Sequence, residues 1–120
     1  MICHVTPRAT WEAARRDGVY RADTLASEGF IHLCDPAQLP GVADRYFRGV
    51  PDLVLLCVDP ARLAARLVYE DSYGAGETFP HLYGPIELAA VERVVDLAVR
   101  PDGRLALPTE LEVNGSADGA

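Results

Sequence analysis

Three histidines are the side chains in this sequence best suited to chemistry, and each of them interrupts a short apolar segment. The segments span residues 2–6, 30–34 and 79–84. Histidine is the usual general acid or base near neutral pH and a frequent metal ligand. One histidine in an apolar strand is most often a core residue, whereas three in matching segments predict that the fold gathers them around one cleft. We therefore predict His4, His32 and His81 as catalytic residues.

Other kinds of catalytic site fit the sequence less well. A zinc site built from three histidines is an alternative, but no two histidines are four residues apart as they would be in a chelating pair on a helix. We therefore predict no metal cofactor. Cys34 would be a nucleophile if His32, two residues earlier on the same strand face, were its base. A buried hydrophobic role for Cys34 is favoured. The glycine-X-serine-X-glycine elbow of serine hydrolases is absent from the sequence.

The length and composition indicate one globular domain. The chain has 120 residues, of which 49% are hydrophobic, and this is enough to bury a core without disulfides or metals. We predict the domain over residues 1–108 and a flexible tail over 109–120. The formal net charge is -7, which opposes the phosphate contacts that dominate nucleic-acid binding. Nucleic acid is therefore not an expected partner. The expected partner is a small-molecule ligand.

The cysteines predict a reduced, cytoplasmic protein. Cys3, Cys34 and Cys57 are an odd number and cannot all pair within one chain. Each lies in an apolar strand context, where cysteine behaves as a small hydrophobe. The longest apolar run covers residues 53–58 and is too short to span a bilayer. We therefore expect no association with a membrane.

Helix signals occur at two places in the first half of the chain. Residues 6–7 are Thr-Pro, a hydroxyl cap followed by proline, and predict a helix over 7–17. Asp35 and Gln38 form a capping-box pattern ahead of apolar residues at helical spacing, which predicts a second helix ending before Gly49. A short helical turn is expected at residues 23–27.

Strand patterns are short and lie close together. They cover residues 1–5, 19–21, 30–34, 52–59, 66–70, 93–99 and 104–107. The continuous apolar run at 53–58 predicts a strand in the centre of a sheet. The Pro-Asp-Gly turn at 101–103 predicts a hairpin, and the glycine-containing segment 71–78 is a predicted lid. These patterns predict an α+β domain with a small, mostly antiparallel, curved or split sheet and flanking short helices.

Two aromatic side chains are further candidates for ligand binding. Tyr83 follows His81 by two residues, so both project from the same face of a strand. Its alternative role is strand packing. Trp11 shares the inner face of the first predicted helix with Ala14, where it either anchors the core or contacts the ligand.

Several segments together resemble a known family. They are residues 2–6, 11–14, 28–34, 38–47 and 79–85. They resemble small bacterial proteins catalogued as domain of unknown function 952, and the likeness runs over about residues 1–98. That family looks like a minimal member of the ADP-ribosyltransferase fold, with the RNA 2'-phosphotransferases as the comparison. The first and second conserved strands of those enzymes are approximated here by residues 4–6 and 32–34.

The resemblance implies an NAD site. It implies that His4 bonds the nicotinamide-side ribose and that the main chain of Val5 lies near the carboxamide. His32 would position the ribose or the attacking group, with His81 and Tyr83 opposite. No metal is needed, because cleavage of the nicotinamide bond relies on orientation and polarisation. The implied cofactor-binding residues are His4, Val5, Thr6, Trp11 and Tyr83.

The expected function is binding of NAD or another nucleotide-like molecule, with transfer of ADP-ribose or cleavage of the nicotinamide bond. The phosphotransferases place an arginine shortly before their second histidine, where this chain has residues 27–29, Ser-Glu-Gly. Transfer of an RNA phosphate is therefore not expected. Two alternatives stay open at this point. One is a non-catalytic module that binds a small ligand or a partner, and the other is a metal-free histidine acid/base enzyme of a biosynthetic pathway.

Overall fold

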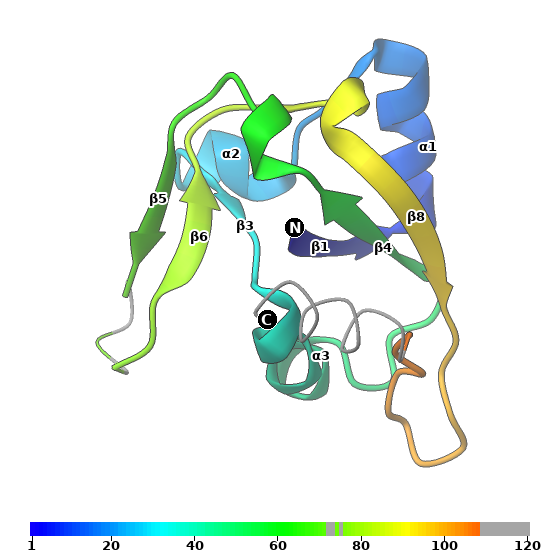
Figure 1. Ribbon diagram of the computed structural model, residues 1–120. Helices are drawn as coiled ribbons and strands as arrows, with labels where there is room; N and C mark the ends of the chain where they lie inside the picture. Colours follow the sequence, from blue (N-terminus) through cyan, green and yellow to red (C-terminus); the bar gives the residue numbers. More distant parts are fainter. Residues whose placement is uncertain (72–73, 75, 109–120) are drawn as a thin grey trace.

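The computed structural model describes residues 1–71, 74 and 76–108 of the chain. The predicted tail, residues 109–120, and three residues of the predicted lid, 72–73 and 75, lie outside the described residues. The fold is α+β, with short helices around small antiparallel sheets (Figure 1). This confirms the predicted class of fold.

The first sheet contains three antiparallel strands in the order β1-β4-β8. They are β1 (Ile2–Pro7), β4 (Leu53–Val58) and β8 (Val91–Leu97). Every residue of β4 is buried, because strands cover both of its edges and side chains pack on both of its faces. The predicted central strand is confirmed.

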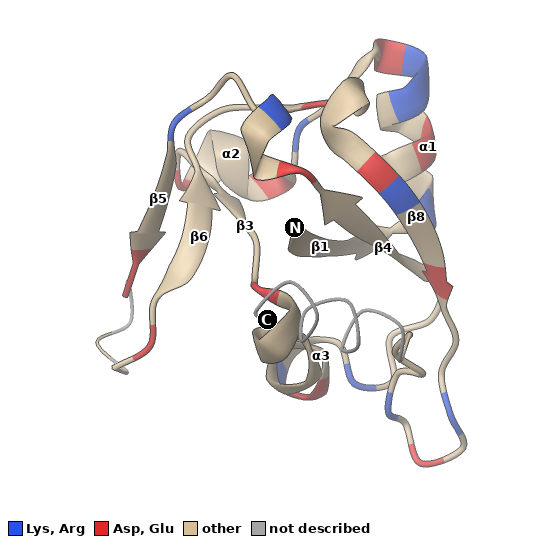
Figure 2. Ribbon diagram, viewed as in Figure 1, with Lys and Arg blue, Asp and Glu red and all other residues tan. Residues whose placement is uncertain are grey.

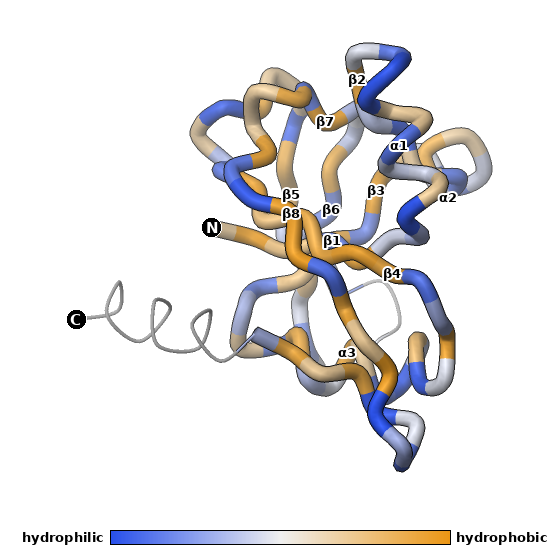
Figure 3. The backbone as a smooth tube through the Cα atoms, turned by 90° about the vertical axis from the view of Figure 1, so that its right-hand side faces the viewer, coloured by the Kyte–Doolittle hydropathy of each residue, from blue (hydrophilic) through white to orange (hydrophobic). Residues whose placement is uncertain are grey.

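The two faces of β4 belong to two different hydrophobic clusters. Val54, Leu56 and Val58 pack with Trp11 and Ala14 of α1 (Arg8–Asp17). The alternate residues, Leu53, Leu55 and Cys57, pack with Leu39 and Ala43 of α3 (Leu39–Tyr46). Side chains of a strand alternate between the faces of a sheet, so an uninterrupted apolar run supplies both clusters. Figure 3 shows this hydrophobic band along β1 and β4.

A second sheet has the order β3-β6-β5 and is also antiparallel. It contains β3 (Ile31–His32), β6 (Phe79–Leu82) and β5 (Leu67–Glu70), with His32 directly opposite His81. A separate two-stranded pair joins β2 (Val19–Tyr20) to β7 (Ile86–Glu87). In Figure 1 the second sheet stands beside the first, with α2 (Asp23–Ser27) between their upper ends and α3 below them.

The two larger sheets join at one pair of residues. Cys3 of β1 donates its N–H to the Cys34 carbonyl over 2.7 Å, and the Cys34 N–H donates to the Cys3 carbonyl over 2.8 Å. In the described part of the chain, no strand pairs with this edge of β1 after the bridge. The sheets therefore separate from each other along the rest of β1, which gives the split sheet that the sequence predicts.

The helix boundaries follow the sequence signals with one correction. α1 ends at Gly18, whose φ of 88° places it in the left-handed conformation that favours glycine. The cap predicted at residues 6–7 is wrong, because Thr6 lies inside β1 and its hydroxyl bonds to Tyr20. Pro7 precedes the first helical residue and makes no side-chain capping bond. The Thr6 hydroxyl is hydrogen-bonded in the interior of the domain instead of capping the helix.

Single turns of 3-10 helix complete the fold. They are η1 (Pro36–Gln38), η2 (Pro60–Arg62) and η3 (Leu88–Ala90). In η1 the Gln38 side chain accepts from the Asp35 N–H over 2.9 Å, as the capping-box pattern predicts. The predicted C-terminal hairpin is present only in part. β8 ends at Leu97, and the returning segment is held by a single Val99–Leu105 bridge rather than by a strand.

Charged residues lie on the outside of this framework. Figure 2 shows them on the outer surface of α1, on β8 and in the connecting loops, whereas β1 carries none. No described helix has both the length and the apolar character that crossing a bilayer requires.

The buried central strand gives a first testable prediction. We expect Leu56→Ala to lower the free energy of unfolding by about 2–5 kcal/mol, because Leu56 is fully buried and its removal leaves a cavity. Val94 is its register partner on β8 and is 39% exposed, so Val94→Ala is the matched control and costs about 0.5 kcal/mol. Chemical denaturation measures both values. Equal losses in the two variants would contradict the central position of β4.

Candidate functional site

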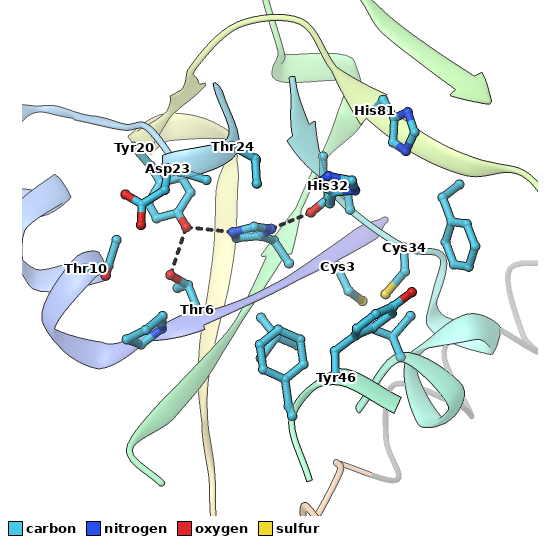
Figure 4. Close-up of a pocket in the computed structure, with 18 residues that line it drawn as sticks. Cys3, Thr6, Thr10, Tyr20, Asp23, Thr24, His32, Cys34, Tyr46 and His81 are labelled. Carbon is cyan, nitrogen blue, oxygen red and sulfur yellow. Dashed lines mark hydrogen bonds between the residues drawn. The ribbon is translucent and has the colours of Figure 1, made fainter. Parts of the chain in front are cut away.

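A pocket of about 470 Å³ lies along the open edge of β1, where the two sheets separate. Its lining includes His4, His32 and His81, so the structure brings the three histidine segments together (Figure 4). The volume is in the range of small-molecule sites. One end is polar and contains Thr10 and Asp23, and the other is apolar and contains aromatic and cysteine side chains.

His4 joins the walls of the pocket through both of its ring nitrogens. Nδ1 lies 2.6 Å from the His32 carbonyl oxygen, and Nε2 lies 2.6 Å from the Tyr20 hydroxyl. Tyr20 is in turn 2.8 Å from the Thr6 hydroxyl. β1 is therefore fastened to β3 on one side and to β2 on the other, and the dashed lines in Figure 4 trace these bonds.

The partners of His4 determine where its proton lies. A carbonyl oxygen only accepts, so Nδ1 carries the proton and donates to His32. In the neutral imidazole, Nε2 then accepts a hydrogen bond from the Tyr20 hydroxyl. Because the Tyr20 proton is engaged in that bond, the Tyr20 oxygen accepts a hydrogen bond from the Thr6 hydroxyl. Thr6 therefore donates to Tyr20, Tyr20 donates to His4, and His4 donates to the His32 carbonyl.

Burial keeps the rings of His4 and Tyr20 uncharged at neutral pH. His4 is 8% exposed, and desolvation lowers its pKa from 6.5 to about 4 although the His32 carbonyl opposes the change. Burial also raises the pKa of Tyr20 to about 12. His4 is therefore a fixed neutral hydrogen-bonding group rather than a base that takes up a proton at pH 7.

His32 and His81 form the other histidine pair, with ring centroids 5.1 Å apart. His32 Nε2 lies 3.2 Å from Glu28, and His81 Nδ1 lies 3.0 Å from Glu70. Phe30 stacks on His81 at a centroid distance of 4.2 Å. Each of these two imidazoles thus has a carboxylate partner, which is the arrangement that orients a histidine for proton transfer.

Glu70 also binds Tyr83. The Tyr83 hydroxyl donates to the same carboxylate oxygen that contacts His81. This bond, followed by the contact with His81, lowers the pKa of Glu70, and the carboxylate raises the pKa of Tyr83. Tyr83 therefore supports the position of His81 from outside the pocket and is not among the lining residues.

The main chain of Val5 faces the pocket. In an antiparallel strand, the N–H and C=O of one residue point to the same side, and this side alternates along the chain. Cys3 directs both groups away from β4 toward Cys34, so Val5, two residues later, directs its own groups to the same side. There the edge of β1 is open, and Val5 belongs to the lining.

One buried hydroxyl at the pocket has no partner. Among the described residues, Thr24 Oγ1 is the buried side-chain oxygen that makes no hydrogen bond. Thr24 lies in α2 and lines the pocket beside Asp23 (Figure 4). Buried hydroxyls are normally paired, so this oxygen is free to bond to a molecule that enters the pocket.

Comparison with known proteins identifies the family. The family described as "Protein of unknown function (DUF952)" matches residues 5–94. The chain belongs to this family. A search of curated proteins gave no match.

Solved structures of one relative have the same fold as this DUF952 domain. The crystal structure of protein CC0527 from Caulobacter crescentus is 38% identical, with a TM-score of 0.83, and the match covers 92% of this chain and 97% of that chain. A solution NMR structure of CC0527 is 37% identical, with a TM-score of 0.80, and the match covers 93% and 97% of the two chains. A crystal structure of a CC0527 double mutant matches over the same shares as the first, at 37% identity and a TM-score of 0.83.

The structure places the residues predicted from the sequence of this DUF952 domain in two groups. His4, Val5, Thr6, His32 and His81 line the pocket. Trp11 is 8% exposed and packs in the core cluster of α1, and Tyr83 contacts Phe30 and Glu70 from outside. In the described residues, no group of three or more histidine, cysteine or acidic side chains is arranged to hold a metal ion.

Cys34 is buried and forms part of the pocket wall. Its pKa is raised by the hydrogen bond with the Cys3 thiol and by burial, whereas the pKa of Cys3 is lowered by the same bond. A nucleophilic cysteine needs the thiolate form. The environment of Cys34 favours the thiol, which agrees with its role as a small hydrophobe.

Sequence reasoning did not identify the polar end of the pocket or most of its aromatic end. Thr10, Asp23 and Thr24 line one end, and Tyr46 and Phe79 line the other. Thr10, Asp23 and Thr24 carry no chemical motif, and Tyr46 and Phe79 lie in segments that carry the family resemblance. The two ends come together because α1, α2, α3 and β6 converge on the open edge of β1. Tyr46 is 55% exposed.

The pKa of His4 generates a prediction for acid stability. Between about pH 6.5 and pH 4 the unfolded chain binds a proton at His4 that the folded chain does not. The free energy of unfolding therefore decreases as the pH falls through this range, by up to about 3 kcal/mol from this group, and the contribution is complete above pH 6.5. His4→Gln, which keeps an amide donor, should remove this part of the pH dependence. Denaturation of both proteins at pH 7 and pH 5 measures it, and equal losses would contradict the assignment.

Proposed function

We propose that the pocket of this DUF952 domain binds a nucleotide-like small molecule, with NAD as the first candidate, and cleaves its nicotinamide bond. We further propose that the split antiparallel sheet is a small version of the ADP-ribosyltransferase fold. The observation that carries both proposals is the open edge of β1 at Val5, inside a pocket bordered by all three histidines.

The open edge is suited to a carboxamide. One N–H and one C=O of Val5 point to the same side, and a primary amide presents a matching acceptor and donor in one plane. Main-chain groups at a strand edge bind ligands in this way without needing a charged side chain. Nicotinamide carries such an amide on an aromatic ring. The pocket has aromatic side chains, Tyr46, Phe47 and Phe79, for a flat ring to contact.

The placement of His32 supports the proposed reaction. Heterolysis of the bond between the nicotinamide nitrogen and the ribose carbon leaves the electron pair on nicotinamide and a positive, oxocarbenium-like sugar. A water molecule then bonds to that carbon and gives up one proton, so NAD⁺ and water yield nicotinamide, ADP-ribose and a proton. His32 is half-buried and has Glu28 at 3.2 Å, so it is the group that would accept the proton. An acceptor hydroxyl in place of water would give transfer of ADP-ribose.

The test measures NAD binding and release of nicotinamide by the purified protein. We expect saturable binding and release, and His32→Ala should slow the release about 100-fold or more, as loss of a general base does. This variant keeps the His32 carbonyl that His4 binds, so its melting temperature should stay close to that of the wild type. Val94→Ala, a truncation to alanine on β8 away from the pocket, should leave release unchanged.

The outcomes separate the alternatives. Binding of NAD without release of nicotinamide would favour a non-catalytic binding module. Absence of binding at millimolar NAD would contradict the proposed function. Release that is equally fast in wild type and His32→Ala would contradict the role of His32.

The His32–His81 pair favours a second candidate, a metal-free acid/base enzyme. Two adjacent imidazoles with centroids 5.1 Å apart, each beside a carboxylate, can supply one proton donor and one proton acceptor to the same small substrate. In that case, both His32→Ala and His81→Ala would abolish turnover of a pathway intermediate, whereas NAD would not bind.

We propose a cytoplasmic location for either activity. Cys3, Cys34 and Cys57 are all buried and unpaired. Free thiols are maintained in reducing compartments.

A further inference from the structure

The charges around the pocket indicate which part of a nucleotide enters it. Among the described residues that line the pocket, Asp23 has the one formally charged side chain at neutral pH, and no arginine is present. The sequence contains no lysine. Phosphate sites normally use arginine, lysine or the N–H groups at a helix N-terminus. A phosphate inside this pocket would meet the Asp23 carboxylate and no arginine or lysine side chain.

Two arginines next to lining residues, Arg8 and Arg45, contact other side chains. Arg8 is bound to Asp52 at 2.9 Å and to Asp96 at 2.7 Å. Arg45 lies over the ring of Tyr46 with its guanidinium carbon 5.8 Å from the ring centroid, and it is exposed rather than part of the lining. A ligand phosphate therefore has a cation available only outside the pocket.

The polar end has the chemistry of a sugar site. Asp23 is an acceptor for ribose hydroxyls, as a carboxylate is in dinucleotide-binding sites. The Thr24 hydroxyl is buried and unpaired, and Thr10 adds a second hydroxyl group. Hydroxyl groups of this kind both donate and accept, which matches a neutral polyol.

The opposite end has the chemistry of a base site. Tyr46, Phe47 and Phe79 line it together with Val42 and the two cysteines Cys3 and Cys34. Tyr46 leaves 55% of its surface exposed, and the Arg45 guanidinium lies over its ring. A flat heterocycle would cover this surface.

We propose that the pocket is a nucleoside site, which takes the base and the ribose and leaves any phosphate outside in solvent. The inference rests on the proposed function and defines its ligand: the unphosphorylated nucleoside is the preferred species. NAD would bind through its nicotinamide riboside portion, with the pyrophosphate at the mouth.

The experiment compares two pairs of probes that differ only by a phosphate: nicotinamide riboside with its 5'-monophosphate, and adenosine with AMP. Calorimetric or NMR titration of the full chain at low and at physiological salt gives each Kd. We expect at least one nucleoside to bind about fivefold or more tightly than its monophosphate. We also expect its Kd to change little with salt, because no phosphate is neutralised.

Thr24→Val tests the sugar end. This substitution keeps the shape of the side chain and removes only an unpaired hydroxyl, so the melting temperature should not fall. It should weaken nucleoside binding about fivefold, the net effect of one hydrogen bond. Thr78→Val is the matched control, since Thr78 is exposed and does not line the pocket.

Each result decides between the proposals. Monophosphates that bind as tightly as the nucleosides or more tightly would overturn the nucleoside site and leave the proposed function intact. Equal effects of Thr24→Val and Thr78→Val would also overturn it. Nucleoside binding without NAD binding would support the site and contradict the NAD function, and binding of neither would overturn both.

Discussion

The hydrogen bonds of His4 are the interaction on which the arrangement of this domain depends. β3 has two residues, and its link to the first sheet consists of the Cys3–Cys34 bridge and the bond from His4 Nδ1 to the His32 carbonyl. The same imidazole accepts from Tyr20 and so fixes β2 as well. A buried apolar side chain at position 4 would leave the Tyr20 hydroxyl and the His32 carbonyl without these partners, and unpaired buried polar groups are destabilising.

The hydrogen bonds of His4 also explain how a domain of this size maintains a pocket. The sheets touch at one residue pair, and His4 holds them there while the next residues of β1 remain unpaired at their outer edge. The polar groups that support the fold therefore also form the wall of the site. His4 is neutral and fully bonded, which suits positioning, whereas His32 and His81 have carboxylate partners, which suits proton transfer.

The sequence predicted the elements well because their signals are local. The apolar run at 53–58, the stop at Gly18 and the reach of Gln38 back to Asp35 all depend on neighbouring residues, and the structure contains each of them. Pairing between distant segments was not predictable in the same way. Nothing local shows that Tyr20 bonds to His4 or that α2 brings Thr24 to β1. The wrong cap at residues 6–7 has the same origin, since a threonine before a proline looks alike whether its hydroxyl caps a helix or binds a distant tyrosine.

The most direct test of the three-histidine pocket is the ¹H–¹⁵N spectrum of the imidazole rings, because the chain has three histidines and each is a separate reporter. At pH 7 the account predicts that His4 carries its proton on Nδ1. It also predicts that added nicotinamide riboside shifts the signals of His4, His32 and His81 along one saturating curve. A proton on Nε2 of His4, or no response of the three rings at millimolar ligand, would contradict it.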